Sequence, residues 1–215
     1  MKKPFTNLYL ASSSPRRKEL LLQIGVNFKI LTIDVDESIC SGEGAETYVE
    51  RVTLLKARAG KSTLMMDNCV VLAADTAVVI EGNILGKPKD KNHALAMLQS
   101  LSGKTHKVIT SVAIMGDNET CCRTCTTEVS FKSLNEIESE LYWQTGEPRD
   151  KAGAYGIQGK GAVFVESITG SYSNVVGLPL KETAELLRHF KVPFWQDEAK
   201  AGVSHQKNIE ETGYK

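Results

Sequence analysis

The most constraining feature of the sequence is the stretch VVLAADTAVVI at residues 70–80, which is apolar almost throughout and carries one carboxylate, Asp75. Valine, isoleucine and alanine at this density, followed by a turn signal at Glu81, Gly82 and Asn83, predict a strand buried on both faces. A carboxylate in such a strand loses hydration, and an unpaired buried ion costs several kcal/mol. Asp75 therefore either caps a structural feature or takes part in chemistry, because perturbed acids cluster at functional sites.

Composition narrows the class of protein. The chain has 215 residues, 41% of them hydrophobic, and its 26 basic residues balance 26 acidic residues. This balance predicts that the protein binds neither nucleic acid nor an anionic membrane surface. No apolar run approaches the roughly 20 residues of a membrane-spanning helix, and the N-terminal apolar stretch is too short for a signal peptide. Five cysteines cannot all pair internally, which favours a cytoplasmic location.

Apolar periodicity predicts strands and helices that alternate along the chain. Strands are expected at residues 7–11, 28–35, 70–80, 108–115, 126–131 and 163–168. Helices are expected at residues 15–24, 46–60 and 179–190, and two more follow Asp90 and Ser133. This order predicts an α/β fold in which helices flank a mixed, twisted sheet. We expect residues 1–192 to form a single domain and the polar residues 193–215 to form a disordered tail.

Two of the predicted helices carry more detailed signals. Ser133 and Glu136 form a capping-box pattern at the start of one helix. In the helix at residues 46–60, helical spacing predicts that one stripe faces the core. Its members are Tyr48, Val52, Leu55 and Ala59.

The segment SSSPRR at residues 12–17 predicts a site for an anion. Ser14 suits the N-cap of the following helix, Pro15 its first position and Gly25 its C-terminal cap. The helix dipole disfavours cations in this first turn, yet Arg16 and Arg17 lie there. A bound phosphate would remove that conflict. The alternative is that the two arginines pair with acidic neighbours on the surface.

Acidic and basic side chains elsewhere extend this prediction. Three acidic residues lie close together in the sequence: Asp34, Asp36 and Glu37. If the sheet brings their carboxylates near Asp75, these oxygen ligands could hold Mg²⁺ together with waters and substrate phosphates. Two lysines are further candidates for phosphate binding. Lys56 lies beside the apolar stripe of its helix, and Lys87 lies in the segment LGKPK. Either lysine could equally be an ordinary solvated side chain.

Several other motifs are discounted. Cys122 and Cys125 have C-x-x-C spacing, but no second pair follows, so a zinc site is not expected. The four histidines show no ligand spacing, and the glycines of AGAYGIQGKGA form neither a dinucleotide-binding fingerprint nor a P-loop. These absences argue against nicotinamide and Walker-type chemistry.

Several ordered motifs together resemble the Maf family of nucleotide pyrophosphatases, and the resemblance extends from Leu8 to Phe190. They are LYLASSSPRRKELLLQIGVNF, VLAADTAVVIEGNILGKPKD, LSGKTHKVITSVAI and EPRDKAGAYGIQGKGAVFVESITGSYSNVVGLPL. The segment DKAGAYGIQG is most similar to the branch that hydrolyses dTTP and UTP. The resemblance implies a Maf/ITPase-like fold with a cleft between two lobes.

The resemblance also implies roles for individual residues. Asp75 corresponds to the general base that activates water for attack on the α-phosphorus, releasing a nucleoside monophosphate and pyrophosphate. A divalent cation, Mg²⁺ or Mn²⁺, is implied on Glu37 and Asp75, and we expect it to acidify the attacking water. The phosphate-binding positions are Ser12, Arg17, Lys56 and Lys87. The positions associated with the choice of base are Arg16, Thr76 and Gln158.

Two alternatives stay open at this point. The family was named for an effect on septum formation, so the nucleotide site could serve a regulator of cell division. The enzyme could also act on another nucleotide, such as 7-methyl-GTP, which is the substrate of a sister branch. Homodimers are usual in the family, and we expect one here.

Overall fold

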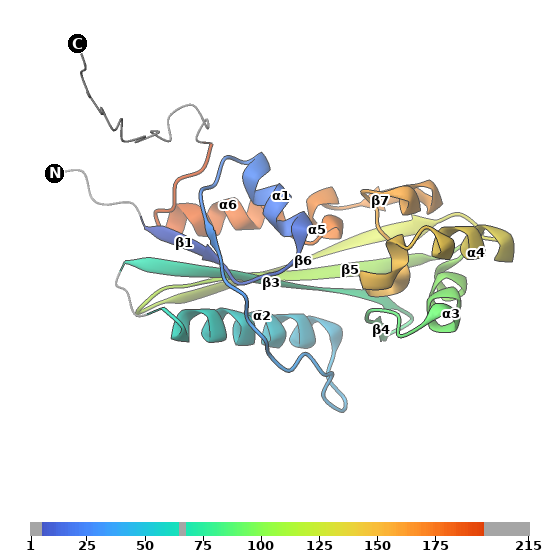
Figure 1. Cartoon of the computed structure of the whole chain (residues 1–215), viewed down its shortest axis with the longest axis horizontal. Helices are drawn as coiled ribbons and strands as arrows, with labels where there is room; N and C mark the ends of the chain where they lie inside the picture. Colours follow the sequence, from blue (N-terminus) through green and yellow to red (C-terminus); the bar gives the residue numbers. More distant parts are fainter. Residues whose placement is uncertain (1–5, 65–67, 196–215) are drawn as a thin grey trace, which may run out of the picture.

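The computed structural model describes residues 6–64 and 68–195, which form a seven-stranded sheet with helices on both faces (Figure 1). The strand order is β2-β1-β3-β5-β6-β7, and the short β4 pairs with β3. The strands are β1 (Asn7–Leu10), β2 (Lys29–Ile30), β3 (Cys69–Ile80), β4 (Asn83–Leu85), β5 (Thr105–Met115), β6 (Thr120–Phe131) and β7 (Val165–Thr169). The pairs β1–β2 and β1–β3 are parallel and the others are antiparallel, so the predicted mixed α/β sheet is confirmed.

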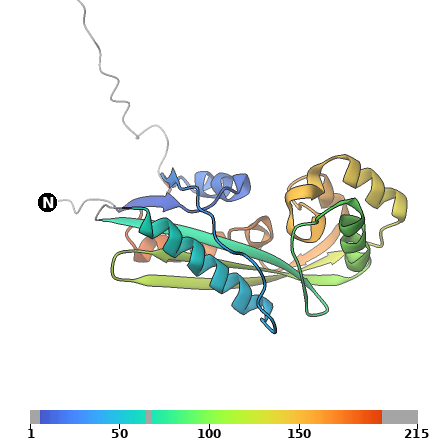
Figure 2. The same cartoon turned by 60° about the horizontal axis from the view of Figure 1, so that its bottom comes forward.

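The helices cover the two faces of the sheet unequally. The long helix α2 (Ala45–Ser62) lies alone along one face, and α1 (Pro15–Gln23), α5 (Tyr172–Val176) and α6 (Leu180–His189) lie on the other (Figure 1). At one end of the sheet are α3 (Lys91–Leu101), α4 (Glu136–Gln144) and the 3₁₀ turns η1 (Glu147–Asp150), η2 (Ala152–Ala154) and η3 (Lys160–Phe164) (Figure 2).

Strand β3 is the buried centre of the fold, as its composition predicts. Ten of its twelve residues are buried. Alternation divides them between two cores, because neighbouring side chains point to opposite faces. Val71 and Ala73 pack beneath α2, whereas Leu72 and Ala74 belong to the large core under the other helices.

Helix α2 approaches the sheet closely. A Cβ at Gly60 would lie 2.9 Å from Val71 Cγ1 and 3.1 Å from Ala11 Cβ, so a larger residue would push the helix away. The buried face of α2 shares only Val52 with the predicted stripe. Tyr48, Leu55 and Ala59 are only partly buried, whereas the fully packed side is formed by Val49, Val52, Thr53, Lys56, Ala57 and Gly60.

Several predicted element boundaries are wrong. The strands expected at 108–115 and 126–131 begin earlier, at Thr105 and Thr120. The expected strand at residues 28–35 is reduced to Lys29–Ile30, because its partner β1 ends at Leu10 and offers no further backbone to pair. The strand expected at 163–168 begins at Val165, after the 3₁₀ turn η3. The capping box of α4 is formed by Asn135 and Glu138, an overlapping pattern two residues after the predicted one.

Other end signals are confirmed. Pro15 opens α1, and Gly25 follows its C-cap with φ +67°, in the left-handed region that glycine tolerates. Ser14 is the N-cap residue, although its side chain makes no capping hydrogen bond. Asp90 caps α3 by accepting a hydrogen bond from the backbone N–H of His93.

The packed chain continues to Trp195, whose backbone N–H donates to the carbonyl of Ile24 at 2.7 Å. We predict disorder for residues 193–215; of these, residues 193–195 are part of the described chain, and residues 196–215 lie outside the described residues. In the part of the chain that the structure describes, each helix is too short or too polar to span a bilayer.

Candidate functional site

A gap in one edge of β3 locates the candidate site. On that edge, β1 pairs with β3 only as far as Leu72, and β4 begins to pair at Val78. The opposite edge is continuously paired with β5 from Val71 to Val79. Within residues 6–64 and 68–195, Asp75 and Thr76 therefore lie where the central strand pairs with no strand on one side.

Asp75 meets two charged residues on the α2 face of the sheet. Its Oδ1 accepts a hydrogen bond from Lys56 Nζ at 2.7 Å, and the same ammonium lies 2.8 Å from Glu37 Oε1. The side chains of Asp75 and Lys56 are only 9% and 10% exposed, whereas that of Glu37 is 47% exposed. Asp75 is thus a buried ion stabilised by a buried cation, with a second carboxylate at the rim.

Glu37 reaches this position from a loop rather than from a strand. The loop that precedes α2 passes the gap, and Tyr48 donates its hydroxyl proton to the carbonyl of Glu37 at 3.1 Å. Burial, together with the charges of Asp75 and Glu37, raises the pKa of Tyr48 to about 12, which keeps the phenol protonated. Asp34 and Asp36 are exposed, and Asp36 instead accepts from the backbone N–H of Ser38.

Arg17 occupies the opposite face of the sheet at the same gap. Its Nε donates to the carbonyl of Gly177 at 2.8 Å, and its two terminal nitrogens donate to Ser12 Oγ at 3.2 Å and Thr76 Oγ1 at 3.1 Å. Burial lowers the pKa of Arg17, and the nearby charge of Asp75 opposes that shift. These hydrogen bonds bring Ser12, Arg17 and Thr76 together.

A chain of hydrogen bonds behind Arg17 was missed by sequence reasoning. Thr76 Oγ1 accepts from Arg17 and lies 3.0 Å from Thr110 Oγ1, which in turn donates to the carbonyl of Asn174. Because Thr110 uses its hydroxyl proton for the bond to Asn174, the hydrogen bond between the two threonines has Thr76 as donor and Thr110 as acceptor. The Asn174 side chain is fully buried and donates to Val108 O and Thr127 Oγ1, so a rigid polar network fixes the arginine.

The remaining predicted residues lie around this centre. Arg16 is 4.0 Å from Asp150, so the surface pairing that we considered for both arginines applies to Arg16 alone. Lys87 is exposed, and the neighbouring carbonyl of Gly86 accepts from Gly153 N–H at 3.1 Å. That contact joins the lysine loop to the glycine-rich segment that carries Gln158, whose side chain is exposed.

The carboxylates of Glu37 and Asp75 offer a divalent cation two hard oxygen donors. Both approach one atom, Lys56 Nζ, and hard cations are commonly held by one or two carboxylates with substrate phosphates and waters. Among the described residues, three potential ligands meet at a different place. Glu119, Cys121 and His189 lie near the β5–β6 turn, where His189 contacts Glu119 at 2.8 Å, although the sequence showed no ligand spacing for any histidine.

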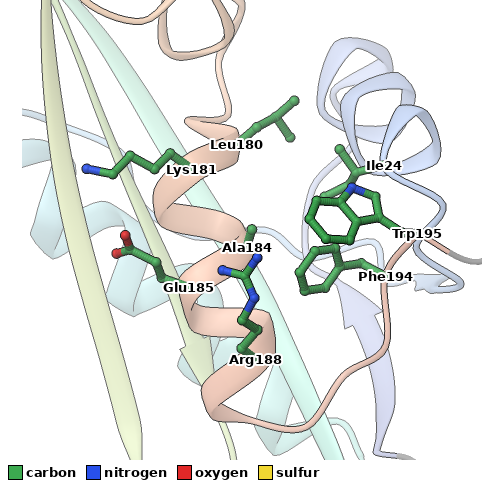
Figure 3. Close-up of a pocket in the computed structure, with 8 residues that line it drawn as sticks. All are labelled: Ile24, Leu180, Lys181, Ala184, Glu185, Arg188, Phe194 and Trp195. Carbon is green, nitrogen blue, oxygen red and sulfur yellow. The ribbon is translucent and has the colours of Figure 1, made fainter.

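Two cavities were found away from the gap. One of about 310 Å³ lies between α6 and the end of α1 (Figure 3). There Arg188 stacks over the ring of Phe194 at 4.9 Å, and Trp195 closes one side. The other, of about 490 Å³, lies on the outer surface of α2. Asp75 lines neither cavity, so the candidate site at the gap in β3 is defined by its charged side chains and not by these cavities.

The fold and the site define an α/β protein with a buried acid–lysine pair and a fixed arginine at one gap in its sheet. The chain belongs to the Maf family: the model of that family, described as Maf-like protein, matches residues 7–190.

The sequences of individual relatives align with this chain over nearly their whole length. A protein named dTTP/UTP pyrophosphatase from Alkalilimnicola ehrlichii is 50% identical over 192 residues, which cover 87% of this chain and 95% of the relative. Proteins of the same name from Aromatoleum aromaticum and Yersinia pestis are 49% and 51% identical. The alignments cover 90% and 86% of this chain and 100% and 93% of those relatives.

Proposed function

We propose that this protein hydrolyses dTTP and UTP to the nucleoside monophosphate and pyrophosphate. The observation that carries the proposal is the meeting of Asp75, Lys56 and Arg17 at one gap in the sheet. Relatives that share about half of the sequence are named for this activity. A base with cations on either side suits attack on a polyphosphate, because the cations stabilise the charge that develops on the phosphate oxygens.

In the proposed reaction, Asp75 accepts a proton from a water molecule as the water oxygen bonds to the α-phosphorus. The bond between the α-phosphorus and the bridging oxygen breaks, and the electron pair leaves with pyrophosphate. Ser12 and the cations Arg17, Lys56 and Lys87 bind the polyphosphate and stabilise the charge that accumulates on the leaving group. The hydrogen bonds of Arg17 to Thr76 and Gly177 fix its guanidinium before the substrate arrives.

We propose that Glu37 and Asp75 hold a divalent cation, Mg²⁺ or Mn²⁺. When bound, such a cation neutralises phosphate charge and lowers the pKa of a water ligand. The support is the chemistry of the donors, because two carboxylates approach one point that Lys56 Nζ occupies. Lys56 would then turn toward the phosphates, which a long flexible side chain permits.

Arg16, Thr76 and Gln158 are proposed to select the base. An exposed side-chain amide such as that of Gln158 can donate to and accept from a pyrimidine edge at once. Thr76 is already bonded to Arg17 and Thr110, so we infer that it acts by holding Arg17. A pocket that depends on such bonds discriminates against bases that leave them unmade.

We further propose a cytoplasmic location and a homodimer without nucleic-acid partners. The five cysteines, all within the described residues, are not joined in disulfides, which suits a reducing compartment. The balanced charge of 26 basic and 26 acidic residues supports the lack of nucleic-acid binding. The dimer rests on the family resemblance.

The test is a panel of dTTP, UTP, CTP, GTP and 7-methyl-GTP, each with Mg²⁺ or Mn²⁺, followed by identification of the products. The proposal requires pyrophosphate with dTMP or UMP. Release of orthophosphate with a nucleoside diphosphate would show attack at the γ-phosphorus and would refute it. Preferred hydrolysis of 7-methyl-GTP, or nucleotide binding without turnover, would instead support the alternative enzyme or a regulator of septum formation.

A further inference from the structure

The loop that carries Gln158 is held by one carboxylate, that of Glu147. Glu147 Oε1 accepts the hydroxyl proton of Tyr142 at 2.8 Å and the backbone N–H of Gly161 at 3.1 Å. Its other oxygen, Oε2, accepts from the backbone N–H of Lys160 at 2.8 Å. Two consecutive backbone groups just after Gln158 are therefore fixed by the same side chain.

Tyr142 fixes the other end of the loop. Its Oη accepts from the backbone N–H of Gly156 at 3.0 Å while donating to Glu147. The residues on either side of Gly156, Tyr155 and Ile157, are buried, at 6% and 8% exposure. Gln158 is thus the first of three exposed residues, 158–160, in a short segment whose two ends are bonded to the Tyr142–Glu147 pair.

The glycines of the loop are required by the closeness of these contacts. A Cβ at Gly159 would overlap the carboxylate of Glu147, and one at Gly161 would lie 2.6 Å from Tyr142 Oη. A Cβ at Gly156 would lie 2.8 Å from Lys151 Cε. The glycine spacing of AGAYGIQGKGA therefore lets the backbone wrap around a carboxylate.

The charge of Glu147 is retained in this setting. Burial raises its pKa, but the backbone N–H groups of Lys160 and Gly161 and the Tyr142 hydroxyl outweigh burial and hold the pKa below its ordinary value. An ionised carboxylate accepts hydrogen bonds through both oxygens, whereas an amide of the same shape has one accepting oxygen and one NH₂ group that only donates. A glutamine at this position would therefore place an N–H against a backbone N–H or a hydroxyl.

We propose that Glu147, through Tyr142 and the 156–161 backbone, is a positioning residue for base recognition: it holds Gln158 in the orientation that selects uracil and thymine. This inference rests on the proposed function. It assigns to Glu147 a role in selectivity rather than in the chemical step, because its contacts are with the loop and not with Asp75 or Arg17.

The test compares kcat and KM for UTP and CTP in the wild type and in Glu147→Gln. The expected result is a rise of about tenfold in the KM for UTP, from the loss of a charged hydrogen bond, with kcat changed by less than about threefold. The ratio of kcat/KM between UTP and CTP should fall toward that of Gln158→Ala. This ratio does not depend on the fraction of folded enzyme, so simple destabilisation leaves it unchanged.

Control variants separate the possible outcomes. Glu136→Gln alters an exposed carboxylate of α4 and should retain the wild-type ratio. In the Gln158→Ala background, Glu147→Gln should cause no further loss of selectivity, because the two residues act together. If Glu147→Gln does not fold, Tyr142→Phe carries the test, since it removes the acceptor of Gly156 N–H and should shift the ratio in the same direction.

Unchanged selectivity in folded Glu147→Gln or Tyr142→Phe would overturn the inference. Its failure is distinct from failure of the proposed function. A wild-type enzyme that releases orthophosphate, or that hydrolyses neither dTTP nor UTP, would refute the function itself. A wild-type preference that survives in the Glu147 variant would refute only the role of Glu147.

Discussion

The buried contact between Lys56 and Asp75 yields the sharpest prediction about stability. Lys56→Met removes the ammonium and keeps a side chain of similar length, which leaves the Asp75 carboxylate without its 2.7 Å partner. The Asp75 side chain is only 9% exposed, so water cannot replace the lost bond fully. Removing one partner of a buried ion pair costs about 3–5 kcal/mol.

The structure favours the lower end of that range. Glu37 is half exposed and loses little when Lys56 is removed, and the charge of Arg17 still acts on Asp75 from the other face of the sheet. We therefore expect the free energy of unfolding to fall by about 3 kcal/mol. For a domain of this size, that loss corresponds to a decrease in Tm of about 6–12 °C.

Urea unfolding of the wild type, Lys56→Met and Lys104→Met measures the effect. Lys104 pairs with Glu81 at 2.8 Å, but both side chains are exposed. The control variant Lys104→Met should therefore lose less than about 1 kcal/mol in its free energy of unfolding. Mg²⁺ or Mn²⁺ should also stabilise Lys56→Met more than the wild type, because the ammonium no longer competes for the two carboxylates. If Lys56→Met loses no more than the control, the Asp75 carboxylate does not depend on Lys56 and the reasoning fails.

Further predictions concern activity and pH. Asp75→Asn should remain folded yet lose at least about a hundredfold in kcat, measured by pyrophosphate release, and near-normal turnover would remove Asp75 from the mechanism. Arg17→Lys keeps the charge but cannot reproduce the bonds to Ser12 and Thr76, so the KM for dTTP should rise about tenfold; an unchanged KM would contradict the assigned role. Burial lowers the pKa of His106 from 6.5 to about 4, so between these values the unfolded chain binds a proton that the folded chain does not, and stability falls as the pH decreases. From about pH 7 to about pH 4.5, the free energy of unfolding, measured with urea, should therefore decrease by about 2.5 kcal/mol less in His106→Gln than in the wild type. An equal decrease in the two proteins would show that His106 is not responsible for the pH dependence.

The buried strand β3 at the centre of the fold could be predicted because residues 70–80 are rich in valine, isoleucine and alanine and are followed by a turn signal, a pattern typical of a buried strand. The alternation of Ile33 and Val35 with Asp34 and Asp36 is equally typical of a strand, yet no strand forms there. Whether a strand forms depends on a partner, and β1 ends at Leu10. Sequence periodicity reports which residues alternate but not how long the neighbouring strand is.

The buried face of α2 illustrates a second limit. Hydrophobicity placed Leu55 on the core side and Lys56 beside it, whereas the structure buries Lys56 at 8% exposure against Asp75. A lysine enters a core only when a distant carboxylate neutralises it, and that carboxylate lies on another element. Lys56 was found as a site residue through the family resemblance.

Residues that act through hydrogen bonds to distant segments were missed altogether. Asn174 supports Thr110 from 64 positions away, and Glu147 holds the 156–161 loop through backbone groups. Neither bond has a periodic or local signal in the sequence. The glycine spacing of the loop was visible, but its cause, the room needed by a carboxylate, required the three-dimensional contacts.

The most direct test of the central claim is hydrolysis of dTTP in water labelled with heavy oxygen, followed by mass analysis of both products. A water molecule activated by Asp75 at the α-phosphorus places the label in dTMP and leaves pyrophosphate unlabelled. Label in pyrophosphate would show attack at the β-phosphorus and would contradict the assignment of the site.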